Sequence, residues 1–259
     1  MGQILCGWAS STEATEENLA DISPASADRS SPHVDSSGSE STSQIDKKFQ
    51  PNVHTKDYTE DKEIWRCALG AGCYWGTEAF MKNKFPKQPS LPPGEILEGA
   101  VGFMGPKSAP ANPDYALVCT GMTKHVEVYD VKFKGGADFF EAMLKYYFSF
   151  HDPTTRDRQG GDRGTQYASV VYCYNKAQYD IATRVKAELQ DHLNKRRLGR
   201  AFTSSRVSTD IRIVEAQFYP AHLDHQEYLE KNPGGYCNHG IKFKAWPVAD
   251  EESEVSAVE

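Results

Sequence analysis

The sequence predicts an α+β protein, a two-layer ferredoxin-like sandwich in which a split β-α-β arrangement carries one extra helix and strand. Apolar segments of strand-like period two alternate with segments of helical spacing. Their order is β-α-β-β-α-β, followed by a helix and a strand. In addition, most aromatic residues lie between residues 61 and 247, which is enough chain for one sizeable hydrophobic core.

The first half of this core contains three predicted strands. A strand over 64–72 leads directly into a helix over 75–84, and a proline-rich loop separates that helix from a second strand over 95–103. A short turn or helix over 114–119 then precedes the third strand, over 124–133.

Two long helices are predicted in the second half. Apolar residues share one helical face from Phe139 to Phe148, and every fourth residue is apolar from Ala177 to Leu193. The remaining predicted elements are a polar, glycine-rich loop over 151–164, a fourth strand over 165–174, a last strand over 210–219 and a short helix over 221–231.

The two ends of the chain differ from this core in composition. Residues 1–60 are rich in Ser, Asp, Glu and Thr, and they cannot bury enough apolar surface to offset the entropy of ordering, so a long disordered coil arm is predicted. Residues 248–259 are acidic and are expected to form a solvated tail. One folded domain is therefore predicted over 61–247.

Charge and cysteine content exclude several classes of protein. A net charge of −7 argues against a nucleic-acid binder, and no stretch is long enough for a transmembrane helix. Six cysteines without a secretory signal favour a reducing, cytoplasmic location. The sequence has no Cys-x-x-Cys pair, which disfavours a thioredoxin-type dithiol and a zinc site, so no metal is expected.

The first residues allow a membrane-attached alternative. Gly2 and Cys6 lie where myristoylation and palmitoylation would provide the two signals for stable anchoring. The usual myristoylation pattern has Ser or Thr where this chain has Cys6, which favours an ordinary start. Membrane association is therefore expected only if Gly2 and Cys6 are acylated.

The most informative cysteine is Cys73, which follows Gly-Ala-Gly at the junction of the first predicted strand and helix. Unpaired backbone N–H groups and the positive end of the helix dipole favour a thiolate at such a junction. Tyr74 and Trp75 follow directly, and two aromatic rings near a surface indicate the lining of a pocket. The pattern predicts a redox or nucleophilic site.

Glu127 lies within the third strand, on the apolar face shared with Tyr129, Val131 and Phe133. Desolvation on that face would raise the pKa of its carboxyl group, so Glu127 is a candidate proton donor. An edge-strand glutamate, or one paired with a nearby Arg or Lys, explains the pattern equally well.

Four further residues are ambiguous on the pattern alone. Asp162 and Tyr167 lie in a glycine-rich loop that runs into a strand. Such a position is typical of site residues and equally of ordinary loop residues without a function. Tyr115 follows turn residues, and Cys237 lies in a flexible stretch after the last helix from which it could reach another thiol. The three cysteines near strands are expected to be small, buried core residues: Cys67, Cys119 and Cys173.

Taken together, these segments closely resemble the peptide methionine sulfoxide reductase A family, in the family's order, over about residues 65–240. Any single block would be weak, but the set is specific. The matching blocks are Gly72-Cys-Tyr-Trp-Gly76 with Glu78 and Phe80, Asn112-Pro-Asp-Tyr-Ala-Leu-Val-Cys-Thr-Gly121, His125-Val-Glu127, Phe150-His-Asp-Pro-Thr154, Arg158-Gln159-Gly160, Asp162-Arg-Gly-Thr-Gln-Tyr167, Thr209-Asp-Ile211, His225-Gln226 and Lys231-Asn-Pro-Gly-Gly-Tyr-Cys237.

The resemblance implies a repair enzyme that reduces methionine S-sulfoxide, protein-bound or free, to methionine. Cys73 would be the nucleophile that attacks the sulfoxide sulfur. Trp75 would hold the substrate's methyl group together with Tyr74, which stands where the family usually has Phe.

The resemblance also implies an acid. Glu127 would give a proton to the sulfoxide oxygen, which is a poor leaving group until it is protonated. Tyr115 and Tyr167 would help through hydrogen bonds, and Asp162 would order a water or the backbone around the thiol.

Turnover would leave Cys73 as a sulfenic acid, which would condense with Cys237 to a disulfide. Thioredoxin would reduce that disulfide as an external reductant, so no bound cofactor is implied, and a monomer is expected. Two alternatives remain open. One is a thiol peroxidase, which also forms a sulfenic acid, and the other is a non-catalytic, membrane-tethered thiol sensor that uses Cys6.

Overall fold

The structure is a computed structural model that describes residues 63–248. The predicted arm over 1–60, the acylation of Gly2 and Cys6 and all but the first residue of the acidic tail lie outside the described residues. Within the described part of the chain, no helix is long and apolar enough to cross a membrane.

Four antiparallel strands form the centre of the sheet: β1 (Trp65–Ala71), β2 (Glu95–Met104), β3 (Val126–Lys134) and β6 (Ser169–Cys173). Their order is β6-β1-β3-β2, with helices between β1 and β2 and between β3 and β6. This arrangement confirms the ferredoxin-like prediction. β6 begins later than the strand predicted over 165–174, because residues Thr165–Tyr167 form a 3-10 turn.

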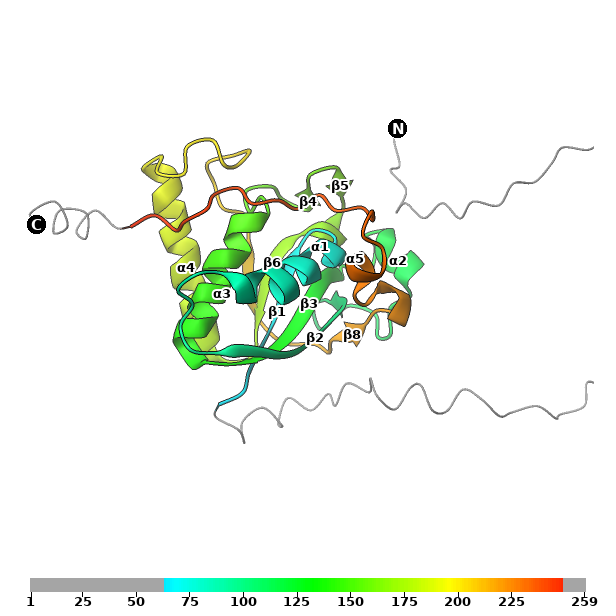
Figure 1. Ribbon diagram of the computed structural model, residues 1–259. Coiled ribbons are helices and arrows are strands. Elements are labelled where there is room, and N and C mark those ends of the chain that lie inside the picture. The colour runs from blue at the N-terminus through cyan, green and yellow to red at the C-terminus, as the bar shows by residue number, and fades with distance from the viewer. Residues whose placement is uncertain (1–62, 249–259) are drawn as a thin grey trace, which may run out of the picture. The chain divides into compact units, whose positions relative to one another are not determined.

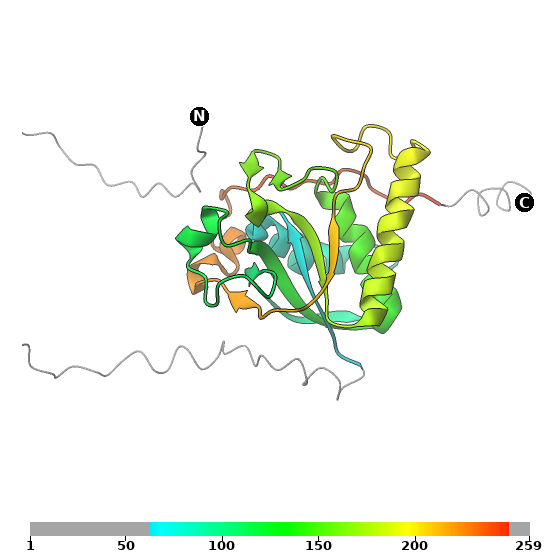
Figure 2. The same cartoon turned by 180° about the vertical axis from the view of Figure 1, so that it is seen from behind.

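Two short strands extend the sheet at opposite edges. β7 (Asp210–Ile213) lies parallel to β6, and β8 (Tyr219–Pro220) lies antiparallel to β2. The chain between them crosses the face of the sheet opposite the long helices, where Phe218 packs on apolar strand residues (Figure 2). The prediction of a single strand over 210–219 is therefore wrong, because the middle of that segment spans the sheet from one edge to the other.

The helices pack on the other face of the sheet (Figure 1). α3 (Gly136–Phe150) and α4 (Lys176–Asn194) are the two long helices that the apolar spacing predicts. α1 (Tyr74–Glu78) is short and continues as a π-helical segment, Ala79–Lys84, so the prediction of a regular helix over 75–84 is only partly correct. The shorter elements are α2 (Tyr115–Cys119), the hairpin of β4 (Arg158–Gln159) and β5 (Asp162–Arg163), the 3-10 turns Phe85–Lys87, Thr165–Tyr167 and Leu223–His225, and α5 (Tyr228–Lys231).

The main hydrophobic core lies between the sheet and these helices. Phe133 of β3 stacks on Phe140 of α3 with ring centroids 5.8 Å apart. Cys67 and Cys173 are fully buried, as predicted, whereas Cys119 at the end of α2 is partly exposed. Aromatic side chains thus fill the face of the sheet that the helices cover. Polar groups lie at the strand ends near α1 and α2.

A buried ion pair lies on the opposite face of the sheet. Nη2 of Arg66 on β1 lies 2.6 Å from Oδ2 of Asp130 on β3, and both side chains are less than a tenth exposed, at 8% and 9%. The Tyr174 hydroxyl donates to Oδ1 of Asp130 at 3.0 Å. A charge buried without its partner is costly, so loss of either member of this pair would weaken the pairing of β1 with β3.

We expect Asp130→Ala to lower the free energy of unfolding by about 3 kcal/mol, because it leaves the Arg66 guanidinium buried without its carboxylate. Lys132→Ala on the same strand removes a more exposed ion pair, with Glu98, and should cost less than ~1 kcal/mol. Urea unfolding followed by circular dichroism measures both values. Equal losses in the two variants would contradict this view of the ion pair.

Candidate active site

Cys73 lies at the turn between the end of β1 and the start of α1, and 8% of its surface is exposed. Gly72 precedes it with a φ of +96°, a left-handed conformation that favours glycine. A Cβ atom at Gly72 would also lie 2.5 Å from Cβ of Gln159, so β4 packs directly on the turn. The structure thus places Cys73 at the strand-to-helix junction that the sequence predicts.

Glu127 lies in β3 and is 2% exposed. The backbone N–H of Tyr74 donates to its Oε2 atom at 3.1 Å. This hydrogen bond joins β3 to the first residue of α1, so the carboxyl group lies beside the turn that carries Cys73. Since the donor belongs to the backbone, the fold itself fixes the orientation of the carboxyl group.

The electrostatics of Cys73 differ from the prediction. Burial raises the pKa of the Cys73 thiol well above its ordinary value, and the charge of Glu127 raises it further. A hydrogen bond from the backbone N–H of Trp75 lowers this pKa, but its effect is smaller. The expectation of a favoured thiolate is therefore wrong for the protein without substrate, because desolvation outweighs the backbone groups at the start of the helix.

Tyr74 and Trp75 form an aromatic cluster with His225. Tyr74 is 1% exposed, and a hydrogen bond of 2.9 Å joins its hydroxyl group to Nδ1 of His225. The half-buried Trp75 ring stacks on Tyr228, with centroids 3.7 Å apart. The ring of Tyr115 lies 4.6 Å from that of His225. The cluster thus brings together three of the predicted site residues, Tyr74, Trp75 and Tyr115.

Tyr115 and Tyr167 come from two short segments that are tied together. Tyr115 is the first residue of α2, and Tyr167 ends the 3-10 turn before β6. The side-chain amide of Gln166 donates to the carbonyl oxygen of Cys119 at 3.0 Å. Both tyrosines are half-buried and pack against the main core, which also contains Cys73.

Cys237 is exposed, and Asp162 binds its neighbours on both sides. The Tyr236 hydroxyl donates to Oδ1 of Asp162 at 3.0 Å, and the Asn238 amide donates to Oδ2 at 2.7 Å. Burial raises the pKa of Asp162 despite these two hydrogen bonds. The side-chain hydrogen bonds of Asp162 are thus with the residues on either side of Cys237, and its charge also raises the pKa of Cys73. Its role in ordering a water or the backbone around the thiol stays a prediction.

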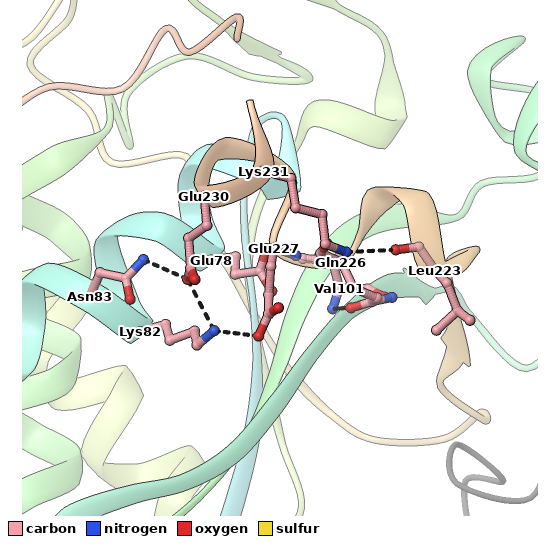
Figure 3. Close-up of polar contacts among 9 residues, drawn as sticks. All are labelled: Glu78, Lys82, Asn83, Val101, Leu223, Gln226, Glu227, Glu230 and Lys231. Atoms are coloured by element: carbon pink, nitrogen blue, oxygen red, sulfur yellow. Dashed lines mark hydrogen bonds and ion pairs between the residues drawn. The ribbon is translucent and has the colours of Figure 1, made fainter. Parts of the chain in front are cut away.

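Polar contacts hold the preceding part of the C-terminal segment against α1 and β2 (Figure 3). The carboxyl group of Glu78, 3% exposed, accepts the backbone N–H of Glu227 at 2.8 Å. The Gln226 side chain accepts the N–H of Val101 and donates to its carbonyl oxygen, each at 2.8 Å. An ion pair of 2.6 Å joins Lys82 to Glu227 nearer the surface. The segment that precedes the second cysteine is therefore anchored beside the first.

The partners that this C-terminal segment supplies carry little pattern in the sequence. His225 and Tyr236 stand out only within matching blocks, and Tyr228 and Asn238 show no periodicity that points to the site. Each contacts residues far away along the chain, so no local signal could have identified it.

A separate cavity is lined, among others, by Thr154, Arg156, Lys186 and Arg206, and none of the predicted site residues contributes to it. Over residues 63–248, no group of three or more His, Cys, Asp or Glu side chains is placed to hold a metal ion.

The groups at the turn between β1 and α1 suit a reaction in which sulfur attacks and oxygen leaves. The thiol of Cys73 lies beside a carboxyl group that can hold a proton. Cys237 is an exposed thiol that contacts His239, whose ring is bound to the carbonyl oxygen of Ala71 in the same turn. An oxidised sulfur at one cysteine can be resolved by a second thiol. The fold and the site define a thiol-dependent oxidoreductase.

Comparison with known proteins identifies the family. Residues 66–255 match the family described as "Peptide methionine sulfoxide reductase". A "Peptide methionine sulfoxide reductase MsrA" of Ectopseudomonas mendocina is 40% identical over 176 residues, which cover 68% of this chain and 72% of the relative. A "Probable peptide methionine sulfoxide reductase" of Schizosaccharomyces pombe is 34% identical over 181 residues, which cover 70% of this chain and 96% of the relative.

Solved structures agree with this result. Reduced Mxr1 of Saccharomyces cerevisiae is 29% identical, with a TM-score of 0.59 and coverage of 70% of this chain and 94% of that chain. Methionine sulfoxide reductase A of Corynebacterium diphtheriae is 31% identical, with a TM-score of 0.55 and coverage of 69% and 79%. The chain belongs to the peptide methionine sulfoxide reductase family. Its activity is that of a peptide-methionine (S)-S-oxide reductase, an oxidoreductase of protein repair.

Glu78 is expected to make stability depend on pH. Burial raises the pKa of Glu78 from 4.5 to about 7, so its contribution to stability is fully present below the unfolded value and is lost as the pH rises through the folded value. Glu78→Gln keeps an acceptor for the N–H of Glu227 without the charge. The stability of this variant relative to the wild type should therefore increase between about pH 5 and pH 8.

Urea unfolding across this pH range measures the difference. Glu230→Gln is the control: hydrogen bonds from Asn83 and Lys82 lower the pKa of Glu230 from 4.5, so its contribution changes only below that value and this variant's difference from the wild type should stay constant across the range. A difference between Glu78→Gln and the wild type that does not change with pH would contradict the expectation.

Tyr74→Phe is expected to lower the free energy of unfolding by about 1 kcal/mol, because His225 loses the hydroxyl partner of its Nδ1 atom. The ring that packs in the cluster remains, so kcat/KM for a methionine sulfoxide peptide should stay within about threefold, or ~0.6 kcal/mol in the barrier. Thermal unfolding and initial rates measure the two quantities. A large loss of kcat/KM at unchanged stability would instead assign the hydroxyl to the reaction.

Proposed function

We propose that Cys73 is the nucleophile and Glu127 the proton donor in the sulfoxide reduction of this family. The observation that supports this most directly is the hydrogen bond of 3.1 Å from the Tyr74 backbone N–H to Oε2 of Glu127. It holds the carboxyl group beside the turn of Cys73, so the sulfoxide oxygen can be protonated while the sulfur is attacked. The other carboxyl oxygen would carry the proton.

Cys73 and Glu127 share one proton in this proposal. The charge of Glu127 raises the pKa of Cys73, and because the repulsion is mutual, the two groups resist ionising together. Transfer of the thiol proton to Glu127 would create the attacking thiolate and the acid in one step. The raised pKa of the thiol thereby couples attack to proton delivery.

Both chemical steps conserve atoms and electrons. In the first, two electrons pass from the Cys73 sulfur to the methionine sulfur, methionine leaves, and the sulfoxide oxygen ends on Cys73 as a sulfenic acid. In the second, Cys237 attacks the sulfenic sulfur, the S–O bond breaks and the S–S bond forms. The oxygen leaves as water together with the proton of the attacking thiol.

The aromatic residues would position the substrate. Trp75 and Tyr74 would contact the methyl group of the sulfoxide, and Tyr115 and Tyr167 would hydrogen-bond its oxygen. The shared packing of these rings at the start of α1 and α2 supports this arrangement. Asp162 would act through the segment that it binds, next to Cys237.

Regeneration would use a thioredoxin-like dithiol. Cys237 is exposed, so a disulfide between Cys73 and Cys237 would be open to a partner's thiolate. Oxidised proteins and free methionine sulfoxide would be the substrates. The catalytic domain would span 61–247 between acidic extensions, in the cytoplasm, with membrane attachment only if the N-terminus is acylated.

Three variants test the residue assignments. Cys73→Ser should abolish methionine release, and Glu127→Gln should slow the first turnover by about 10²-fold while Cys73 remains open to alkylation. Cys237→Ser should release one equivalent of methionine and then stop with thioredoxin as the reductant. Methionine release from the separated S and R epimers of a sulfoxide peptide measures each effect.

Some outcomes would overturn this proposal. Multiple turnover of Cys237→Ser with thioredoxin would remove the resolving role, and full activity of Glu127→Gln would remove the acid. Reduction of hydrogen peroxide in preference to the sulfoxide would favour a thiol peroxidase. Retention of the biological effect in Cys73→Ser, with loss of membrane fractionation in Gly2→Ala, would favour the tethered sensor.

A further inference from the structure

His239 lies two residues after Cys237, and one side of its ring is bound to the β1–α1 turn. Its Nε2 atom lies 2.7 Å from the carbonyl oxygen of Ala71. A carbonyl oxygen only accepts hydrogen bonds, so Nε2 carries the hydrogen. Burial lowers the pKa of His239 to about 4, so the ring is neutral near pH 7 and Nδ1 holds a lone pair.

The lone pair of Nδ1 has the second cysteine as its partner. The Sγ atom of Cys237 lies 3.9 Å from Nδ1 of His239, a hydrogen-bond distance for sulfur. Because Nδ1 can only accept in this tautomer, the thiol S–H is the donor. The thiol of Cys237 therefore already faces the lone pair of a neutral imidazole.

The imidazole is held in place by its surroundings. A Cβ atom at Gly76 would lie 2.1 Å from Nδ1, so α1 approaches the ring as closely as a glycine permits. The rings of Phe80 and Phe150 pack beside it, with centroids 6.1 Å and 5.7 Å from the centroid of the His239 ring. The backbone N–H of Gly240 donates to the Phe150 carbonyl oxygen at 3.0 Å. The base is thus fixed, whereas the cysteine that it faces is exposed.

We propose that His239 accepts the proton of the Cys237 thiol when Cys237 attacks the sulfenic acid of Cys73. This inference rests on the proposed function of the two cysteines. The S–H bond of Cys237 and the S–O bond of Cys73 break, the disulfide bond forms, and the proton and the departing hydroxyl group leave as water. Because the buried imidazolium is disfavoured, His239 passes the proton on and is neutral again for the next turnover.

Burial, together with the charged groups nearby, keeps the imidazole ring of His239 neutral. Lys84 and Lys242 lower the pKa of His239, and the hydrogen bond to Ala71 raises it without cancelling the effect of burial. His151 lies nearby and is itself neutral, because burial lowers its pKa to about 3. His239 therefore stays a base with an available lone pair down to mildly acidic pH.

The pH profile of the wild-type enzyme tests the proposal. Without a base, the disulfide step would need a free thiolate, and the supply of thiolate falls about tenfold for each pH unit by which the solution is made more acidic. With His239 as the base, the rate of disulfide formation after one turnover should vary by less than about threefold between about pH 5 and pH 8. Rapid acid quench, alkylation of the remaining thiols and mass spectrometry give this rate.

His239→Gln removes the base and keeps an amide donor for the Ala71 carbonyl oxygen. It should release the first methionine at the wild-type rate, which also shows that the variant is folded. Disulfide formation should be slowed by about 10²-fold at pH 7, and the deficit should shrink as the pH rises, because hydroxide can then take the place of the missing base. His222→Gln is the matched control, since that side chain is 75% exposed and pairs with Asp224, and it should behave as wild type.

Two results with the His239→Gln variant would overturn the role of His239. One is disulfide formation in His239→Gln at the wild-type rate near pH 7, and the other is a deficit of equal size at every pH, which would mean that the substitution only displaces Cys237. A wild-type rate that falls tenfold per pH unit would do the same, independently of any variant. Failure of the wild-type enzyme to release the first methionine would instead overturn the proposed function, and the inference with it.

Discussion

The hydrogen bond from the Tyr74 backbone N–H to Oε2 of Glu127 joins the first residue of α1 to β3. Glu127 is 2% exposed, and a carboxyl group at that depth needs a donor to offset its desolvation. Its partner is a backbone group whose position follows from the turn after β1. The pairing of β1 with β3 and the turn after β1 therefore set the distance between the Glu127 carboxyl group and the Cys73 thiol. Side-chain flexibility changes this distance little.

The same turn is also bound from the C-terminal side of the chain. His239 donates to the carbonyl oxygen of Ala71, and Gln159 packs on Gly72. Asp162 fixes the residues on either side of Cys237. The two sulfur atoms are thus positioned against one stretch of backbone, although they come from opposite ends of the described chain. Cys237 is nevertheless exposed, so in the proposed reaction it would be directed toward Cys73 while staying open to a partner.

The sequence predicts most of the frame and only part of the site. Period-two and helical spacing identify the four central strands and both long helices, because each of those elements buries one regular face. The strand predicted over 210–219 fails because a segment that crosses a sheet can be as apolar as one that pairs with it. His225 and His239 could not be assigned from the sequence, since their partners lie in β1 and α1 and only tertiary contact gives them a role.

The raised pKa of Cys73 bears on the choice between reduction of sulfoxides and reduction of peroxides. Oxidation of a thiol by peroxide follows its thiolate character and its exposure. At 8% exposure, and with burial and Glu127 both opposing ionisation, the resting thiol has little of either. A sulfoxide differs from a peroxide in that its oxygen must be protonated to leave, which the shared proton of Cys73 and Glu127 would provide. Burial of Cys73 therefore protects the resting thiol from oxidation by peroxide. It also favours a sulfoxide as the substrate, because the sulfoxide oxygen is basic enough to take up a proton.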